Sequence, residues 1–415
     1  MDAAFQMKTS ISLLAGLVIL GTGAAGQDWP QFRGPDRDGI VPGRMTVASF
    51  PSDGPELVWE MAVGAGFSAP VVRLGQLVIF HRRADQEVVE ALRASDGESV
   101  WKFSYETEYR DDFGFDNGPR AAPVIANGRV FTFGAQGILH CLDFESGQKL
   151  WSVDTHREFG VRKGFFGAAS TPLVLDGRVL ANIGGQDDAG IVAFDAATGE
   201  TLWTATDHAA SYSSPIAAPL DGNTMAVFFT REGLAALDPA TGQVVYERRW
   251  RSRSNASVNA ATPVVMGDIV FLSASYGTGS IAMRLCNRKV EELWAGEGVI
   301  DNHYSSCVRD GGTLFGFHGR QEHGQSFRAA DLATGKLLWS HSPIRAGSVM
   351  RIGDRLLLLL ESGEAMLVAA SREKFEILSR AQILGGETRA FPAVADGLLF
   401  ARDTDSLVCL RLWSE

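Results

Sequence analysis

The sequence predicts an all-β protein, an eight-bladed β-propeller whose blades are four-stranded antiparallel sheets. Three observations predict this fold. First, a glycine followed four positions later by a large aromatic residue recurs along the chain. Second, short apolar segments alternate with turn residues at a period of ~40–50 residues, which is the length of one propeller blade. Third, the last copy of the repeat lacks its final strand, whereas the first copy is preceded by a strand without a repeat of its own.

One copy shows all four strands of the repeat. Residues 171–175 form a first apolar strand, and the Asp176-Gly177 pair that follows is typical of a tight turn with positive φ. Residues 178–203 supply the other three strands. The chain contains eight such starts, and the other seven lie near Ser68, Arg120, Ser213, Ala260, Tyr304, Ala346 and Arg389.

The two ends of the chain are predicted to complete one blade together. After residues 407–412 the chain reaches Glu415 without a fourth strand. Residues 57–60, Leu-Val-Trp-Glu, have the pattern of a fourth strand without the preceding three. We therefore expect residues 57–60 to complete blade eight, so that the ring closes and no open sheet edge remains.

The recurring aromatic residues are predicted to be structural. An indole at the same place in each blade packs between adjacent sheets, where it buries ~150–250 Å². Residues spread one per blade around a ring do not form a stacking platform for nucleic acid. The predicted docking residues are Trp59, Trp101, Trp151, Trp203, Tyr246, Trp294 and Trp339.

The N-terminal residues have the pattern of an export signal. Lys8 precedes an apolar run at residues 11–20, and Ala24 and Gly26 are small residues suited to cleavage before Gln27. We expect a signal peptide at residues 1–26, a leader segment at 27–56 and the propeller at 57–415. The location implied is the periplasm or the outside of the cell, without a later membrane span and without a lipid-anchor cysteine at the cleavage point.

Composition excludes several classes of function. The net charge of −11 opposes binding to nucleic acid. The four cysteines match no metal knuckle or haem-attachment spacing, and two of them, Cys141 and Cys409, lie in apolar strand contexts that favour free buried thiols. No metalloprotease, phosphate-loop or nucleophile-elbow motif occurs.

Three segments carry a resemblance to a known family. Residues 194–203, 237–242 and 330–339 resemble the tryptophan-docking repeat of pyrroloquinoline-quinone (PQQ) propellers, and the resemblance extends over essentially the whole chain after Gln27. Residues 29–35 resemble the leader of exported bacterial PQQ-repeat proteins. The family contains PQQ-dependent dehydrogenases and also non-catalytic propellers that bind partners, such as the outer-membrane assembly factor BamB.

The resemblance to the dehydrogenases implies features that this sequence lacks. Those enzymes have two adjacent cysteines beside the quinone, and no two cysteines are adjacent here. They also hold a calcium ion with oxygen ligands. The nearest candidate loop, residues 112–118, has oxygens at alternate positions, but Pro123 stands where a bidentate glutamate is needed, and residues 36–39 match less well. We expect neither a metal nor a cofactor, and PQQ with calcium remains the alternative.

The loops that lead into the first strands are predicted to form a binding site at the mouth of the channel. A proline begins six of these strands, and alignment on it brings a set of aromatic and basic residues to one ring. Arginines from blades two, seven and eight share one sector, which suits a small anionic ligand or an acidic partner. The alternative is that they pair with carboxylates such as Asp116 or Asp301. The candidate residues are Phe67, Arg120, Tyr212, Asn259, His303, Tyr304, Arg345 and Arg389.

The leading hypothesis from the sequence is an exported, monomeric, non-catalytic propeller that binds a protein or another cell-envelope component. The alternative is a PQQ-dependent oxidoreductase of the alcohol- or sugar-dehydrogenase kind. The repeat alone does not choose between them, because a fold does not determine a function.

Overall fold

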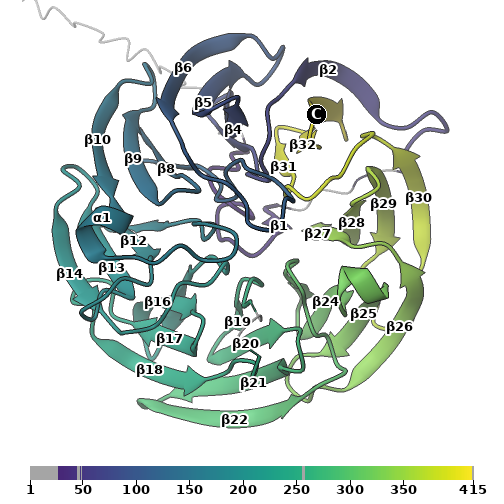
Figure 1. The fold of residues 1–415 in the computed structure, drawn as a ribbon. Helices are drawn as coiled ribbons and strands as arrows, with labels where there is room; N and C mark the ends of the chain where they lie inside the picture. The colour runs from purple at the N-terminus through teal and green to yellow at the C-terminus, as the bar shows by residue number, and fades with distance from the viewer. Residues whose placement is uncertain (1–26, 44–46, 48, 255–257, 414–415) are drawn as a thin grey trace, which may run out of the picture.

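The computed structural model describes residues 27–43, 47, 49–254 and 258–413. They form eight sheets arranged in a ring, as the sequence predicted (Figure 1). The predicted signal peptide, residues 1–26, lies outside the described residues. No helix in the described part of the chain combines the length and the apolar character needed to cross a bilayer.

The first four blades follow one another along the chain, and each is a four-stranded antiparallel sheet. Blade 1 contains β3 (Val71–Arg73), β4 (Gln76–Arg83), β5 (Gln86–Arg93) and β6 (Ser99–Glu106); blade 2 contains β7 (Val124–Ala126), β8 (Arg129–Phe133), β9 (Ile138–Asp143) and β10 (Lys149–Asp154); blade 3 contains β11 (Leu173–Leu175), β12 (Arg178–Asn182), β13 (Ile191–Asp195) and β14 (Thr201–Ala205); blade 4 contains β15 (Ile216–Leu220), β16 (Asn223–Phe229), β17 (Gly233–Leu237) and β18 (Val244–Arg249).

The second half of the ring differs in its last two blades, which take up strands from the N-terminal part of the chain. Blade 5 contains β19 (Val264–Met266), β20 (Ile269–Ala274), β21 (Gly279–Cys286) and β22 (Lys289–Gly296); blade 6 contains β23 (Val308–Asp310), β24 (Thr313–His318), β25 (Gln325–Asp331) and β26 (Leu337–Ile344); blade 7 contains β1 (Ile40–Val41), β27 (Gly347–Ile352), β28 (Arg355–Leu360), β29 (Glu364–Ala369) and β30 (Ile377–Gln382); blade 8 contains β31 (Ala393–Ala395), β32 (Leu398–Arg402), β33 (Ser406–Arg411) and β2 (Glu56–Ala62). Two short helices, α1 (Thr155–Phe159) and η1 (Gln321–His323), lie in the loops.

The predicted closure of the ring is confirmed. Strand β2 pairs antiparallel with β33 and becomes the outer strand of blade 8, with Trp59 opposite Cys409 and Met61 opposite Leu407. In Figure 1, β2 lies beside the C-terminal strands. Blade 8 thereby has four strands, with β2 as its outer strand, and the two ends of the described chain are joined in one sheet.

The tryptophans dock between blades, as predicted. In six of the eight blades the indole N–H donates to a backbone carbonyl of the next blade, at 2.8–3.2 Å. The repeat glycine lies against the indole of the preceding blade, and a Cβ added at Gly147 would stand 2.4 Å from the Trp101 ring. The glycine and the aromatic residue of the repeat are therefore two halves of one contact between neighbouring blades.

Tyr246 fills the docking position of blade 4 in a different way. Its hydroxyl donates to the Asp221 carboxylate of its own blade, and the same carboxylate accepts the backbone N–H of Asn287 at 3.0 Å and of Arg288 at 3.3 Å from blade 5. A carboxylate thus bridges the two blades where the indole bond is missing. The hydroxyl bond holds the pKa of Asp221 below its usual range.

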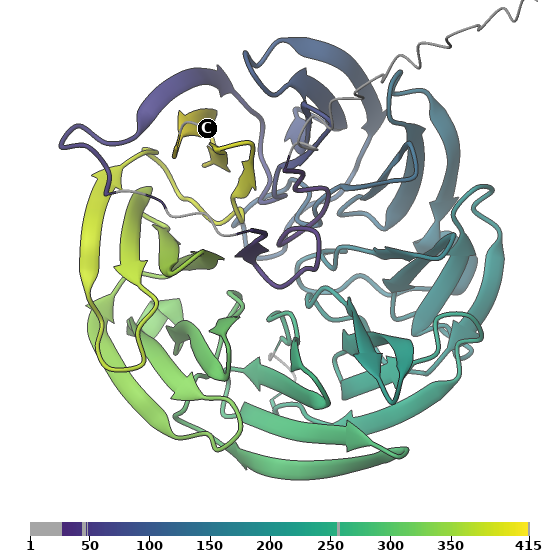
Figure 2. The ribbon, with the colours of Figure 1, turned by 180° about the vertical axis from the view of Figure 1, so that it is seen from behind.

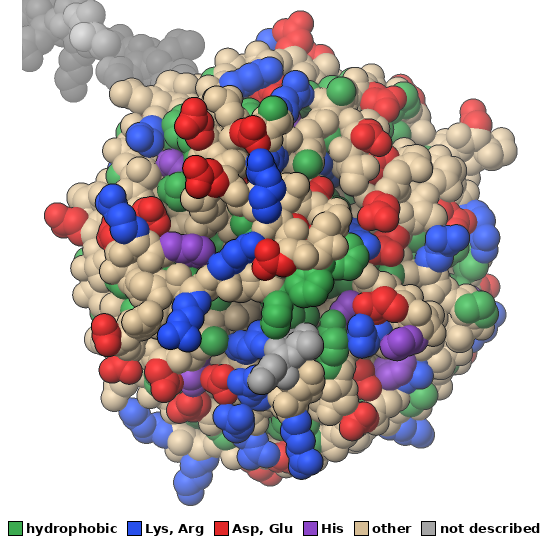
Figure 3. Space-filling view, in the orientation of Figure 1, with side chains coloured by type: hydrophobic (Ala, Val, Ile, Leu, Met, Phe, Trp, Pro, Cys, Tyr) green, Lys and Arg blue, Asp and Glu red, His purple; other side chains and the backbone are tan. Residues whose placement is uncertain are grey.

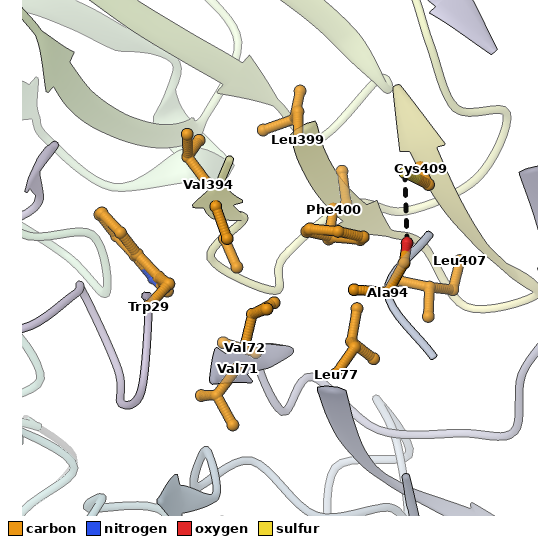
Figure 4. Close-up of a cluster of buried hydrophobic side chains, with 14 of the residues drawn as sticks. Trp29, Val71, Val72, Leu77, Ala94, Val394, Leu399, Phe400, Leu407 and Cys409 are labelled. Atoms are coloured by element: carbon orange, nitrogen blue, oxygen red, sulfur yellow. Dashed lines mark hydrogen bonds between the residues drawn. The ribbon is translucent and has the colours of Figure 1, made fainter. Parts of the chain in front are cut away.

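The leader enters the channel of the ring and contacts most of the blades. Trp29 forms a bridge with Val72 of blade 1, and its indole stacks on Phe391 at the start of blade 8, with 6.4 Å between ring centroids. Strand β1 then adds in parallel to β27 of blade 7. Figure 2 shows the leader crossing the centre of the ring, and Figure 4 shows Trp29 near Val72 and Val394 in the core between blades 1 and 8.

Two arginines of the leader are buried in the channel, each with 1% of its surface exposed. Arg37 donates to the carbonyls of Thr171 at 3.2 Å, Pro215 at 2.9 Å and Pro172, which belong to the starts of blades 3 and 4. Arg33 donates to the Cys307 carbonyl at 2.6 Å, just before blade 6. The leader is therefore a cross-brace within the channel.

Cysteine usage agrees with the prediction for strand positions. Cys141 and Cys409 are free and buried, and so is Cys307, whereas Cys286 is free and half-buried. Burial raises the pKa of Cys141 and of Cys409 to about 12. These thiols therefore remain protonated at neutral pH and are inert packing groups.

Acid should weaken the fold through His140, which packs against the rings of Phe103 and Tyr105. Burial lowers the pKa of His140 to about 4 from an ordinary value of 6.5. The unfolded chain therefore takes up a proton near pH 6.5, whereas the folded chain does not, and stability is lost as the pH falls from 6.5 toward 4. This one residue should account for ~2 kcal/mol between pH 7 and pH 5.

The variant His140→Phe tests this prediction. Among the described residues, the His140 Nδ1 atom has no hydrogen-bond partner, so the substitution breaks no hydrogen bond at that atom. Thermal unfolding at pH 7 and pH 5 should show a smaller acid shift in the variant than in the parent protein. The exposed His323 provides the control, and His323→Gln should keep the full shift. Equal shifts in His140→Phe and the parent would contradict the assignment.

Candidate functional site

A pocket of about 240 Å³ opens at one mouth of the channel. Its lining includes Phe32 of the leader and Phe391 just before β31, so the leader forms part of the pocket wall. Six of the eight residues predicted from the sequence line it: Phe67, Arg120, Tyr212, His303, Tyr304 and Arg389. On the face seen in Figure 3, hydrophobic side chains gather near the centre of the ring with Lys and Arg side chains beside them.

The alignment on proline explains why four of these residues meet: Phe67, Arg120, Tyr212 and Arg389. The strands of six blades begin one residue after the aligned proline, at Val71, Val124, Leu173, Ile216, Val264 and Ala393. The preceding residues are therefore carried to equivalent positions around the axis. This geometry brings residues separated by hundreds of positions into a single pocket.

Two of the three predicted arginines lie together. The guanidinium carbons of Arg120 and Arg389 stand 5.7 Å and 5.3 Å from the centroid of the Phe67 ring. Arg120 also lies over Phe166, and Arg389 lies over Phe115 at 5.4 Å. The side chains are only 12% and 18% exposed, so aromatic faces hold both guanidinium groups in place.

Each of these arginines faces a carboxylate, although not the ones predicted. Arg389 Nε lies 2.9 Å from Glu361 Oε1, and Arg120 Nη2 lies 3.7 Å from Asp111 Oδ1. Arg120 donates to the backbone carbonyl of Asp116 at 3.0 Å, and not to its carboxylate. Asp301 is turned toward Gly298 and His318 instead. The same two guanidinium groups thus line the pocket and face carboxylates.

The other two predicted residues are outside the pocket lining. Asn259 is 2% exposed, and its side-chain amide donates to the Thr230 carbonyl at 2.8 Å. Its own carbonyl accepts the backbone N–H of Tyr212 at 3.0 Å, so it supports a pocket residue from behind. Arg345 is exposed on the loop before β27 and does not join the other two arginines.

The opposite wall is a chain of hydrogen bonds around His303. The Tyr276 hydroxyl lies 2.9 Å from His303 Nε2, and Gln321 Oε1 lies 2.9 Å from His303 Nδ1. Because Gln321 Oε1 is an acceptor, Nδ1 carries the proton and Nε2 accepts from the tyrosine. Burial lowers the pKa of His303, which keeps the ring neutral. Tyr304 donates to Glu361 at 2.7 Å and so joins this wall to Arg389.

Sequence reasoning missed the exposed aromatic residues at the rim. Phe113 and Phe115 are 55% and 51% exposed and pack on Phe166. They belong to the segment considered as a calcium loop. There the Asp116 carboxylate accepts the backbone N–H of Gly66 at 3.0 Å and of Gly118 at 2.5 Å, so it holds the loop.

A second cavity of about 490 Å³ lies beside the first, among the loops of blades 2, 3 and 4. Its lining includes Arg162, Lys163, Arg231 and Tyr212, and Tyr212 is shared with the channel mouth. Lys163 donates to Asp112 at 2.5 Å, which ties the two loops that form its entrance.

The dehydrogenase resemblance implies a calcium ion with oxygen ligands and two adjacent cysteines beside the quinone. In the part of the chain that the structure describes, no three His, Cys, Asp or Glu side chains come together to hold a metal. The four cysteines lie in or beside different blades: Cys141 in blade 2, Cys286 in blade 5, Cys307 before blade 6 and Cys409 in blade 8.

Comparison with known proteins finds similarity both to an outer membrane protein assembly factor and to a quinohemoprotein dehydrogenase, but over different shares of the chain. The chain is 24% identical to outer membrane protein assembly factor BamB of Shewanella oneidensis over 311 residues, which are 70% of this chain and 71% of that protein. It is 29% identical to quinohemoprotein alcohol dehydrogenase ADH-IIG of Pseudomonas putida over 120 residues, but these are 28% of this chain and only 16% of the enzyme.

Structural comparison agrees on the fold. BamB from Moraxella catarrhalis superposes with a TM-score of 0.61 over 86% of this chain and 97% of that structure, at 16% sequence identity. The family model described as outer membrane protein assembly factor BamB matches residues 84–322, more than half of the 415 residues. The PQQ-like propeller repeat predicted from the sequence is thereby confirmed, and the chain belongs to the family of outer membrane protein assembly factor BamB.

Proposed function

We propose that this protein is a non-catalytic scaffold of the cell envelope that docks a protein partner during the assembly of outer membrane proteins. Its relatives across most of the ring are outer membrane protein assembly factors. The proposal includes export through residues 1–26 and action without a bound quinone. The observation that carries it is the aromatic and basic rim of the channel mouth in a member of this family.

The rim has the composition of a protein interface. Arginine and large aromatic residues dominate the binding energy of interfaces, and exposed aromatic side chains mark places that a partner covers. Phe113 and Phe115 are half-exposed, and the rings of Phe165 and Phe166 lie within 6.2 Å of them, centroid to centroid. A preformed cluster of this kind loses little conformational freedom on binding.

The polar groups of the mouth favour recognition over chemistry. His303 is held on both ring nitrogens by Tyr276 and Gln321, and the Tyr304 hydroxyl is held by Glu361. A general base needs a ring nitrogen that is free to take a proton from substrate. Here the neutral imidazole is used to fix the wall of the pocket.

Removal of the gene from its host tests the proposed function. The amount of folded outer membrane β-barrel proteins, measured by the heat-dependent change of their gel mobility, should fall at least about twofold. The gene for the parent protein, and that for Arg345→Gln as a control, should restore it. Unchanged protein levels, together with dye reduction by the purified protein in the presence of PQQ and calcium, would overturn the proposal in favour of a quinoprotein oxidoreductase.

A further inference from the structure

Arg389 is a largely buried cation whose hydrogen-bonding capacity is mostly unused. Its guanidinium group lies between the rings of Phe67 and Phe115. Glu361 approaches only the Nε edge, without the alignment of a hydrogen bond, and Glu387 stays 3.7 Å from Nη2. A guanidinium carries five N–H donors. Among the described residues, neither Nη atom of Arg389 donates a hydrogen bond, so the outer edge of the group remains open to the pocket.

Arg120 places a second cation on the same ring. It shares Phe67 with Arg389, and its nearest carboxylate oxygen, Asp111 Oδ1, is 3.7 Å away and accepts no hydrogen bond. Asp111 and Glu361 face these two cations, but the Nη donors of Arg389 stay open. An additional carboxylate at Arg389 would use these open donors and would also be attracted by the charge of Arg120.

The size of the pocket limits what can bring that carboxylate. A volume of about 240 Å³ is below the ~300–1,000 Å³ typical of pockets for free small molecules. It suits a single side chain that projects from a larger partner. The exposed face of Phe115, next to Arg389, offers an apolar surface for a neighbouring side chain of the same partner.

We propose that the channel mouth binds an acidic segment of a protein partner, with an Asp or Glu carboxylate held by Arg389 and Arg120 and an adjacent apolar side chain packed on Phe115. This inference rests on the proposed scaffold function and names the chemistry by which the partner is recognised. Tyr304 and Glu361 fix the position of Arg389 from behind. They act as positioning residues for the guanidinium group.

Saturation-transfer NMR with the mature protein tests the proposal. The probe is a capped pentapeptide, Ala-Phe-Asp-Phe-Ala, and its Asn analogue differs only in the carboxylate. The Asp peptide should bind at least about tenfold more tightly than the Asn peptide, because a charge-assisted bidentate bond is lost in the analogue. The difference should shrink in high salt. Equal binding of the two peptides would overturn the proposal.

Matched variants locate the site. Arg389→Gln should weaken the Asp peptide about tenfold and leave the Asn peptide unchanged, and Arg389→Lys should recover part of the loss, since it keeps the charge without the fork. The exposed Arg345→Gln is the control and should bind like the parent protein. Phe115→Ser, at a half-exposed position, should weaken the binding of both peptides. This variant still tests the site if Arg389→Gln proves too unstable to use. Unchanged binding in both Arg389→Gln and Phe115→Ser would overturn the proposal.

Further outcomes distinguish a peptide carboxylate from that of a small molecule, and the peptide proposal from the scaffold function on which it rests. Benzoate, or PQQ with calcium, binding more tightly than the peptide with the same dependence on Arg389 would overturn the peptide proposal in favour of a small-molecule site. Full restoration of outer membrane proteins by Arg389→Gln would also overturn it, while the scaffold function would stand. Failure of the gene removal itself to lower those proteins would instead remove the scaffold function.

Discussion

A chain that begins at Val63 should unfold at a clearly lower temperature than the mature chain, and it should aggregate. It lacks β2, so β33 loses its partner and becomes an open sheet edge. It also loses Trp59, whose indole donates to the Ala94 carbonyl of blade 1 at 2.9 Å. Loss of a buried tryptophan alone removes ~3–5 kcal/mol.

The matched control is a chain that begins at Glu56, which lacks the leader but keeps β2. The difference between the two truncations isolates ring closure and should exceed ~5 kcal/mol, or more than ~5 °C in melting temperature for a chain of this size. Calorimetry or circular dichroism measures it. If both truncated chains melted together, β2 would contribute nothing and the ring would be held closed by other contacts.

The closure was predictable because the repeat is a local pattern that can be counted. Each strand and turn is encoded within about ten residues, as in the Asp176-Gly177 turn, whose φ angles of 47° and 74° are both positive. Once seven complete copies and one incomplete copy are counted, the unassigned strand at Trp59 has only one place in a ring. The contact between the repeat glycine and the preceding indole follows from the same periodicity.

The bridge that the Asp221 carboxylate forms between blades 4 and 5 was not predictable from the repeat, and neither was the path of the leader. Asp221 occupies an ordinary turn position, and only the packing of blade 4 on blade 5 shows that Tyr246 needs it. The leader contains no repeat, so its sequence indicates no register against the ring. Arg33 and Arg37 are buried, although sequence patterns place arginine at the surface.

The candidate site was partly predictable, for a related reason. Alignment on proline places residues that precede each first strand at one mouth, and six of eight line the pocket there. Arg345 instead lies exposed on the loop before β27 and outside the pocket lining, although His303 and Tyr304, which also precede a strand without the aligned proline, do line it. Phe115 and Glu361 were missed because the alignment does not reach them: Phe115 lies earlier in the loop that contains Arg120, and Glu361 lies in the turn between β28 and β29.

Replacement of Arg37 by methionine should lower the free energy of unfolding by ~3–5 kcal/mol, or the melting temperature by ~3–6 °C. The methionine fills a similar volume but leaves the carbonyls of Thr171, Pro172 and Pro215 without their donor. A buried acceptor without a partner retains its full desolvation penalty. Among the residues that the structure describes, no carboxylate forms an ion pair with Arg37, and burial lowers its pKa to about 9.

The pattern across three variants distinguishes a cross-brace from a loosely bound leader. Arg37→Lys should be intermediate, since a single ammonium group keeps the charge but cannot reach carbonyls of blades 3 and 4 with a planar fork. Arg345→Met, an exposed arginine, should melt within about 1 °C of the parent protein, because surface changes have small effects. If Arg37→Met also melted like the parent, the leader would not tie blades 3 and 4 together in solution. The chain lacking residues before Glu56 would then be expected to lose stability through Trp29, Arg33 and β1.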